Sequence, residues 1–273
     1  MTASLPPHDF ELGLVASDID GTLLAEWQPI SAATIDAIHR CQDAGIPFVP
    51  VTGRPIRWLA PIAEQIPDLG RVVCLNGAVI YDIAAQSVVS AHTLDHRIVE
   101  EIVSSITAAH PQAHFAYETL TGGLIDREFV TRRPRQAEVI DDVAELAVHD
   151  VVKVLVSIGT KDSQSLHDLL GPLVTETCHA SFSDPENGLV ELAPAGITKA
   201  QTLESLCEHL GVRRSQVMAF GDMPNDIEML SWAGHGVAMG NALGSVKEIA
   251  AAVTDSVADD GVARYLNAVL DAR

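Results

Sequence analysis

The chain has 273 residues, 47% of them hydrophobic and 20% charged, which is typical of a globular protein with a sizeable core. Its formal net charge of -20 repels nucleic acid and anionic membrane surfaces, so we expect neither as a partner. No apolar run approaches the roughly 20 residues that span a bilayer. Residues 1–11 lack the basic and long apolar regions of a signal peptide, so we expect a cytoplasmic protein.

The same negative charge would repel a phosphate ester. An enzyme for such esters therefore needs local positive charge, most simply a metal ion with a few well-placed cations. The chain contains only four lysines (Lys153, Lys161, Lys199 and Lys247), so a lysine within a motif is of interest. The four cysteines are far apart and show no C-x-x-C spacing, which argues against a disulfide framework or a zinc site.

Strand and helix patterns alternate in the first third of the chain. The predicted elements are a strand, a helix capped by Ser31, a strand, a helix and a strand, at 12–16, 31–44, 46–51, 55–66 and 72–75. This alternation predicts a parallel sheet with right-handed crossovers. The last third resumes it, with strands at 216–220 and 236–239 and helices at 198–210, 225–232 and 243–251, followed by a last segment at 262–270.

The middle of the chain predicts a second α/β module. Its expected elements are helices and strands at 95–109, 114–117, 151–158, 163–170 and 174–180. We therefore expect an inserted module at 81–187 within a first domain made of 1–80 and 188–273. A basic stretch with Arg132, Arg133 and Arg135 could face an anionic substrate, although a solvated basic turn is the simpler interpretation.

The sharpest motif is Asp18-Ile19-Asp20-Gly21-Thr22, which follows the first predicted strand. Ligands bind in open α/β sheets beyond the carboxyl ends of the strands. Two carboxylates there can share a hard cation, and the Thr22 hydroxyl can hold them by hydrogen bonding. A chance surface turn and helix capping are competing interpretations. An EF-hand is excluded because its sixth and twelfth positions hold Leu23 and Pro29.

Three further groups are expected at the same edge of the sheet. Thr52-Gly53-Arg54 ends the second strand, where a hydroxyl and successive N–H groups can cradle an anion. The segment 221–226 follows another strand and offers Asp222, Asn225 and Asp226, which could also be helix-capping residues. Lys199 begins a predicted helix, where a cation opposes the helix dipole, so a role other than a solvated surface lysine is favoured.

Together these motifs resemble the haloacid dehalogenase superfamily of phosphatases, and most closely its Cof-type sugar phosphatases. The resemblance covers the chain from about residue 13 onward, with its middle matched by placement and length more than by motif. The matching stretches are 17–23, 51–54, 76–78, the segment around Lys199, 221–226, 236–242 and 260–263.

The resemblance implies a Rossmann-like core with an inserted cap, and a phosphatase that works through a phospho-aspartate. It implies Asp18 as nucleophile and Asp20 as general acid and base. It also implies a magnesium ion, Mg²⁺, bound by the Asp18 carboxylate, the Asp20 backbone carbonyl and Asp222. The phosphoryl oxygens would be held by Ile19, Thr52, Gly53, Lys199 and Asn225, with Thr22, Arg54 and Asp226 in support.

Two alternatives stay open at this point. A phosphotransferase or mutase of the same superfamily would pass the phosphoryl group to another hydroxyl. A phospho-receiver module also phosphorylates an aspartate beside magnesium, but it needs only about 120 residues, and the D-x-D pair and the large insertion count against it. The expected partner is a small phosphorylated metabolite, with a sugar phosphate favoured. The sequence does not define the substrate or the oligomeric state.

Overall fold

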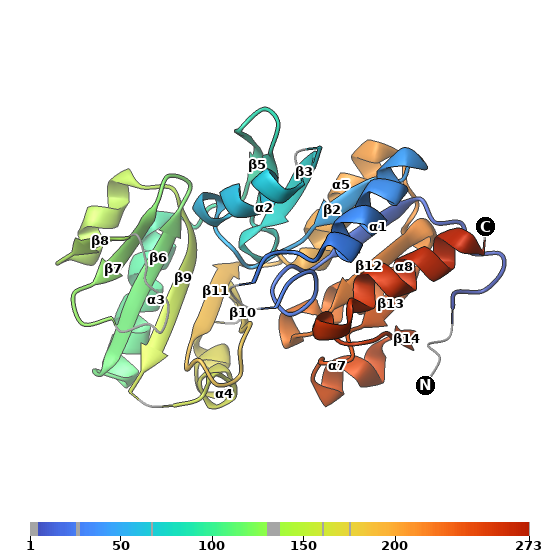
Figure 1. The fold of residues 1–273 in the computed structure, drawn as a ribbon. Coiled ribbons are helices and arrows are strands. Elements are labelled where there is room, and N and C mark those ends of the chain that lie inside the picture. The colour runs from blue at the N-terminus through green and yellow to red at the C-terminus, as the bar shows by residue number, and fades with distance from the viewer. Residues whose placement is uncertain are drawn as a thin grey trace.

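A computed structural model describes residues 5–25, 28–66, 68–129, 137–159, 161–174 and 176–272 (Figure 1). The basic stretch at Arg132, Arg133 and Arg135 lies outside the described residues. Within the described ranges, no helix combines the length and the apolar character that crossing a membrane requires.

The first module, which we call the core, contains a five-stranded parallel sheet in the order β14-β13-β12-β1-β2. Its strands are Leu14–Ser17 (β1), Phe48–Pro50 (β2), Val217–Gly221 (β12), His235–Ala238 (β13) and Ala252–Val253 (β14). Every residue of β1, β2, β12 and β13 is buried. Burial on both faces explains why these strands are continuous apolar runs in the sequence.

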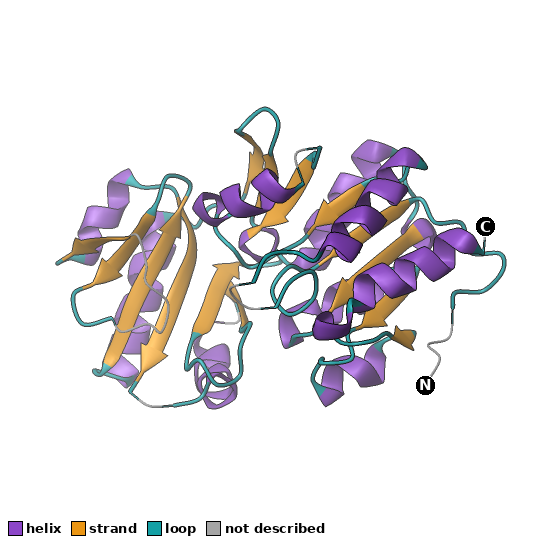
Figure 2. Ribbon diagram, viewed as in Figure 1, coloured by secondary structure: helices purple, strands orange, loops and turns teal. Residues whose placement is uncertain are grey.

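Helices lie on both faces of this sheet (Figure 2). They are Ala32–Asp43 (α1), Lys199–Leu210 (α5), Ile227–Trp232 (α6), Gly244–Ile249 (α7) and Gly261–Asp271 (α8), with short 3₁₀ turns at Arg214–Gln216, Pro224–Asp226 (η5) and Val257–Asp259. Two predicted helix starts are confirmed. The Ser31 side chain accepts the Thr34 backbone N–H, and the Thr198 side chain accepts that of Gln201.

The third predicted strand differs from expectation in its partners. It spans Arg71–Cys74 (β3) and pairs antiparallel with Val79–Asp82 (β4), which pairs with Ser87–Ala91 (β5). One parallel bridge, Val51 to Val73, joins this small sheet to the parallel sheet. The helix predicted at 55–66 is two shorter pieces, Ile56–Trp58 (η1) and Ala60–Gln65 (α2).

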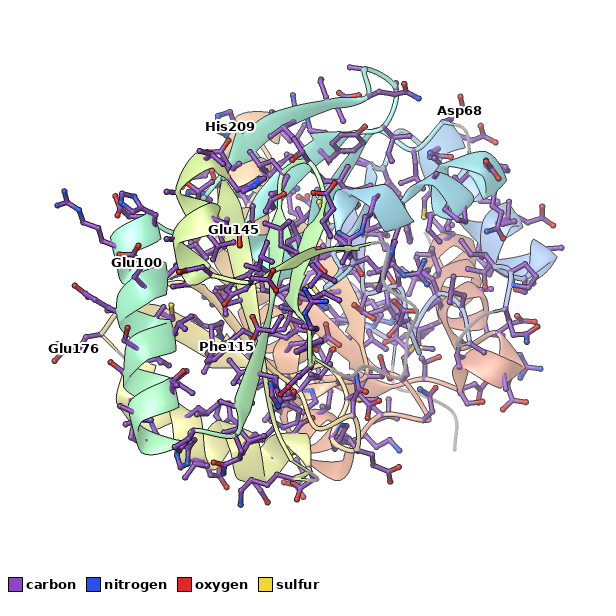
Figure 3. The ribbon with its side chains drawn as sticks, turned by 90° about the vertical axis from the view of Figure 1, so that its left-hand side faces the viewer. Asp68, Glu100, Phe115, Glu145, Glu176 and His209 are labelled. Atoms are coloured by element: carbon purple, nitrogen blue, oxygen red, sulfur yellow. The ribbon has the colours of Figure 1, made fainter. Side chains whose placement is uncertain are left out.

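The second module, which we call the cap, contains a six-stranded mixed sheet in the order β10-β11-β9-β6-β7-β8. Its strands are Ala113–Thr119 (β6), Gly123–Asp126 (β7), Ala137–Ile140 (β8), Val151–Ile158 (β9), Cys178–Ser181 (β10) and Val190–Pro194 (β11). One face of the sheet is covered by His96–Ala109 (α3), Val143–Val148 and Ser163–Val174 (α4). In the view from the cap end, Glu100 lies on α3 and Phe115 on β6 of the sheet (Figure 3).

The predicted fold class, an α/β protein with a parallel core sheet and an inserted α/β cap, is confirmed. The limits at 80/81 and 187/188 stay predictions. Strand pairing crosses both of them, because β4 contains residue 81 and pairs with β3, and β11 lies beyond residue 187 and pairs with β9.

Candidate active site

The sequence-predicted site residues gather at the carboxyl edge of the parallel sheet. Ser17, the last residue of β1, pairs with Pro50 of β2 and Phe220 of β12. The chain therefore leaves three neighbouring strands side by side, and the motifs containing Asp18, Thr52 and Asp222 begin there.

Three carboxylates form a buried cluster at this edge. Asp18, Asp222 and Asp226 each offer an oxygen, and these oxygens all lie within 4.8 Å of one another. The three residues are 6%, 1% and 0% exposed. Like charges at such separations repel strongly in a low-dielectric interior, so the cluster requires neutralisation by cations or protons.

Lys199 supplies part of that charge. Its ammonium group donates to Asp18 Oδ1 at 2.6 Å and to Asp226 Oδ1 at 2.7 Å, and its side chain is 1% exposed. Burial alone would lower the pKa of Lys199, but the two carboxylates raise it above the ordinary value, so the side chain is charged. Lys199 is stable at the start of a helix because its attraction to the two carboxylates exceeds the unfavourable interaction with the helix dipole.

One lysine does not balance three carboxylates. Burial, and then the neighbouring Asp226 and Asp222, hold the pKa of Asp18 well above its usual value despite Lys199. Burial and Asp226 likewise raise the pKa of Asp222 to about 7. The excess negative charge and the all-oxygen ligand set fit a hard divalent cation such as Mg²⁺.

Asp226 is held by more than Lys199. Its Oδ2 accepts the backbone N–H groups of Asp222 and Met223, both at 3.0 Å. With Oδ1 bound to Lys199, both oxygens of Asp226 are engaged. This arrangement suits a residue that positions Asp222 and Lys199 better than one that ligates a cation.

The loop after Asp18 packs closely on Asp222. Gly21 has φ +86°, and a Cβ placed there would lie 2.3 Å from Asp222 Oδ2, so only glycine fits. The Thr22 hydroxyl donates to Asp222 Oδ1 at 2.9 Å. Asn241 bridges the same two segments, because its Nδ2 donates to the Gly21 carbonyl at 2.8 Å and to Asp222 Oδ2 at 3.4 Å.

Asp20 lies apart from the buried carboxylate cluster. Its two carboxylate oxygens accept from Arg54 Nε and Nη2, each at 2.7 Å, in a bidentate ion pair. The side chains are 26% and 16% exposed. Arg54 thus joins the Thr52-Gly53-Arg54 segment to the D-x-D motif, and its supporting role in the site stays a prediction.

The predicted phosphate-binding residues lie around the same point. Thr52 is 1% exposed, and its hydroxyl accepts the Arg54 backbone N–H at 3.1 Å. Asn225 Nδ2 donates to Asn76 Oδ1 at 3.2 Å. Ile19 is fully buried and its carbonyl accepts the Leu23 N–H at 2.9 Å. The role of each residue toward phosphate stays a prediction.

A cavity opens above these residues, between the core and the cap. From the core it is lined by Asp18, Asp20, Thr52, Gly53, Arg54 and Asn225, and from the cap by Lys153, Ser183, Asp184, Asn187, Leu189 and Glu191. The Asp18 and Asp20 carboxylates, the Thr52-Gly53-Arg54 segment and the cap therefore meet at one space with room for a small molecule.

A family model described as haloacid dehalogenase-like hydrolase matches residues 15–266. The chain belongs to this family. The resemblance drawn from the motifs is confirmed, including its Cof-type assignment and its assignment to phosphatases.

Relatives of this haloacid dehalogenase-like chain match along nearly their whole length. The 5-amino-6-(5-phospho-D-ribitylamino)uracil phosphatase YitU of Bacillus subtilis is 29% identical, over 93% of this chain and 96% of that protein. The pyridoxal phosphate phosphatase YbhA of Escherichia coli is 30% identical, over 93% and 97%. A solved haloalkanoate-superfamily phosphatase structure from Bacteroides thetaiotaomicron has TM-score 0.83 and 27% identity, covering 98% of this chain and 99% of that one.

Sequence reasoning assigned no role to several residues that contact the site. Asn241 and Asn76 lie in stretches that supported the resemblance, but no contact could be assigned to them. Lys153 and Glu191 were not singled out. A signal for Lys153 was present, since it is one of only four lysines and interrupts the apolar strand sequence 151–158.

Proposed function

We propose that this protein is a magnesium-dependent phosphatase that hydrolyses a small phosphorylated metabolite through a phospho-aspartate at Asp18. The observation that best supports the proposal is the buried cluster of Asp18, Asp222 and Asp226 with Lys199 bonded between two of its members. Phosphoryl transfer depends on charge neutralisation and on in-line positioning.

Asp18 is the proposed nucleophile because it opens onto the cavity and because Lys199 orients its carboxylate through Oδ1. The proposed Mg²⁺ ligands are the Asp18 carboxylate, the Asp20 backbone carbonyl and the Asp222 carboxylate. A bound Mg²⁺ would supply the positive charge that this carboxylate-rich site lacks. Asp226 and Thr22 hold Lys199 and Asp222 in place.

Asp20 is the proposed general acid and base. It lines the cavity within the same loop as Asp18, so it can protonate a leaving oxygen and later take a proton from water. Arg54 orients this carboxylate. The backbone of Ile19 and Gly53, the Thr52 hydroxyl, the Lys199 ammonium and the Asn225 amide are the proposed donors to the phosphoryl oxygens.

The substrate is proposed to be a small phosphate monoester, with sugar phosphates the first class to test. Two relatives are phosphatases of 5-amino-6-(5-phospho-D-ribitylamino)uracil and of pyridoxal phosphate by name, which supports a small phosphorylated metabolite as substrate. The cap side of the cavity offers Ser183, Asp184 and Asn187, whose side chains can bond hydroxyl groups.

A panel of phosphorylated metabolites tests this function. When Mg²⁺ is present, the purified protein should release inorganic phosphate from at least one of three substrates: a sugar phosphate, 5-amino-6-(5-phospho-D-ribitylamino)uracil or pyridoxal phosphate. Chelation should abolish release and added Mg²⁺ should restore it, because carboxylates around a phosphate dianion repel it without a cation. Undiminished turnover after thorough chelation would contradict the metal assignment.

A further inference from the structure

A buried ion pair lies on the face of the cap sheet that turns toward the core. Along β9, Val154 and Val156 join the cluster beneath α3 and α4, whereas Lys153 and Leu155 alternate to the other face. Along β11, Val190 and Leu192 join the same cluster and Glu191 alternates away from it. Side-chain alternation along strands therefore places Lys153 and Glu191 together on the core side.

The pair reaches directly to the proposed phosphate-binding residues. Lys153 Nζ donates to Glu191 Oε2 and to the Gly53 carbonyl, each at 2.9 Å. Asn76 Nδ2 donates to the same Glu191 oxygen, and Asn76 Oδ1 accepts from Asn225 at 3.2 Å. We call Asn76, Lys153 and Glu191 the bridging network, since they connect the cap to Gly53 and Asn225.

These contacts fix the orientation of the Gly53 peptide. Its carbonyl is held by Lys153, and the N–H at the other end of the same peptide unit, that of Arg54, is held by the Thr52 hydroxyl at 3.1 Å. The second Glu191 oxygen accepts from Ser183 at 3.2 Å, so the carboxylate is held from both sides. A cap residue therefore holds the carbonyl end of the Gly53–Arg54 peptide unit, which lies within the proposed anion cradle.

A buried ion pair gives little net stability, because desolvating both charges offsets their attraction. Lys153, Glu191 and Asn76 are 2%, 8% and 4% exposed. Burial would raise the pKa of Glu191, but Lys153 and the hydrogen bonds that Glu191 accepts lower the pKa below its usual value, so Glu191 is ionised. The contacts that the ion pair makes therefore explain it better than its small contribution to stability does.

We infer that Lys153, Glu191 and Asn76 are positioning residues for phosphoryl binding, so that the phosphate site in the core is complete only when the cap is seated on it. The inference rests on the proposed function. None of the three needs to touch the reacting atoms. They act through Gly53 and Asn225, and they make phosphate affinity depend on the contact between cap and core.

The test is the double variant Lys153→Met/Glu191→Gln, measured with inorganic phosphate as a competitive inhibitor. Both side chains keep their approximate size, both charges disappear together, and the Gln oxygen can still accept from Asn76. Replacing both members avoids an unpaired buried charge, so the variant should fold. Its phosphate inhibition constant should rise about tenfold and its kcat/KM should fall at least as much, since a charge-assisted hydrogen bond to the cradle is lost.

A matched control is the ion pair between Arg57 and Glu118, which joins the core to the cap. Arg57, in η1, donates to Glu118 of β6 through both terminal nitrogens, with side chains 17% and 3% exposed. Glu118 also lines the cavity, but among the contacts of the described residues the hydrogen bonds that Arg57 donates reach neither Gly53 nor Asn225. The double variant Arg57→Met/Glu118→Gln removes an ion pair but keeps the Lys153 bond to the Gly53 carbonyl, so its phosphate inhibition constant should stay within about twofold of the parent value.

Two further measurements distinguish loss of positioning from a general loss of folding stability. The thermal midpoint of Lys153→Met/Glu191→Gln and its upward shift on adding Mg²⁺ should match those of the parent, because the carboxylate cluster is untouched. An unchanged phosphate inhibition constant in this variant, or an equal rise in the control variant, would overturn the inference. A parent protein that hydrolyses no ester and binds no phosphate would instead contradict the proposed function.

Discussion

Asp18 and Asp20 are separated by one residue, yet they lie in different electrostatic surroundings. The Asp18 side chain is 9% exposed and bonded to Lys199, beside two further carboxylates. The Asp20 side chain is 26% exposed and bonded through both oxygens to Arg54. A carboxylate held against a lysine within an acidic cluster suits attack on phosphorus, and one on the cavity wall suits proton transfer.

Substituting Asp20→Asn should separate the two chemical steps. Loss of the acid and base should lower turnover about 10²–10⁴-fold. An ester whose leaving group needs no proton, such as p-nitrophenyl phosphate, should still phosphorylate Asp18. The second step then becomes slow, and the covalent adduct should accumulate. Mass spectrometry after rapid quenching should find phosphate on the peptide that contains Asp18.

The control for this experiment is Asp18→Asn. An amide is a poor nucleophile and the site loses an anionic ligand, so both turnover and the adduct should be absent. Phosphate on any other residue in Asp20→Asn, or near-normal turnover of that variant, would contradict the assigned roles.

At the scale of elements, the turn after β3 aligns two parts of the site. Leu75, Asn76 and Gly77 all have positive φ, and Gly77 reaches +106°. A Cβ at Gly77 would lie 2.3 Å from the carbonyl oxygen of Thr198, the residue that caps α5 immediately before Lys199. The turn that carries Asn76 is therefore packed directly against the helix start that carries Lys199.

Substituting Gly77→Ala should disturb both the fold and the position of Lys199. The positive φ and the contact with a backbone atom should lower the free energy of unfolding by about 2–3 kcal/mol. Displacement of α5 should reduce kcat at least tenfold, since Lys199 moves with the helix start. Denaturant unfolding and steady-state kinetics measure the two effects. Gly70→Ala is the control, because nothing lies within 4 Å of its added Cβ and both values should stay near the parent's.

The sequence identified most elements because their local signals are strong. The buried strands β1 and β12 are apolar runs, and Ser31 and Thr198 are capping residues at helix starts. It located β3 but missed the antiparallel pairing with β4, because an apolar run does not reveal which strand it pairs with. The turn at Leu75–Gly77, with its run of positive φ, returns the chain into β4, and the antiparallel pairing follows from it.

In the candidate site, too, local motifs could be found from the sequence and long-range contacts could not. Residues within short motifs, such as Asp18 and Asp222, could be found because strand ends bring motifs to one edge. Lys153 could not be placed, since it meets Glu191 and Gly53 across separations of 38 and 100 residues. The first contact depends on strand pairing within the cap and the second on how the cap is seated on the core, and no local pattern encodes either.

At the scale of the whole molecule, the distribution of charge links metal binding to stability. The chain has a net charge of -20 and buries three carboxylates within 4.8 Å of one another around one lysine. The raised pKa of Asp222, about 7 against 3.8, means that the metal-free protein loses stability as pH rises between these values. A bound cation instead requires the ionised carboxylates, so Mg²⁺ and protons compete for the cluster.

Thermal unfolding with and without Mg²⁺ therefore tests the cluster independently of any substrate. At a free concentration of 100 times the dissociation constant, Mg²⁺ should stabilise the fold by about 2.7 kcal/mol, which for a chain of this size raises Tm by about 5–10 °C. The shift should be larger at pH 8 than at pH 6, because protonation of Asp222 opposes binding at the lower pH. Asp222→Asn should lose the shift, yet its metal-free Tm at pH 8 should exceed the parent's, since one of three repelling charges is gone. An equal Mg²⁺ shift in this variant would show that the cation binds elsewhere.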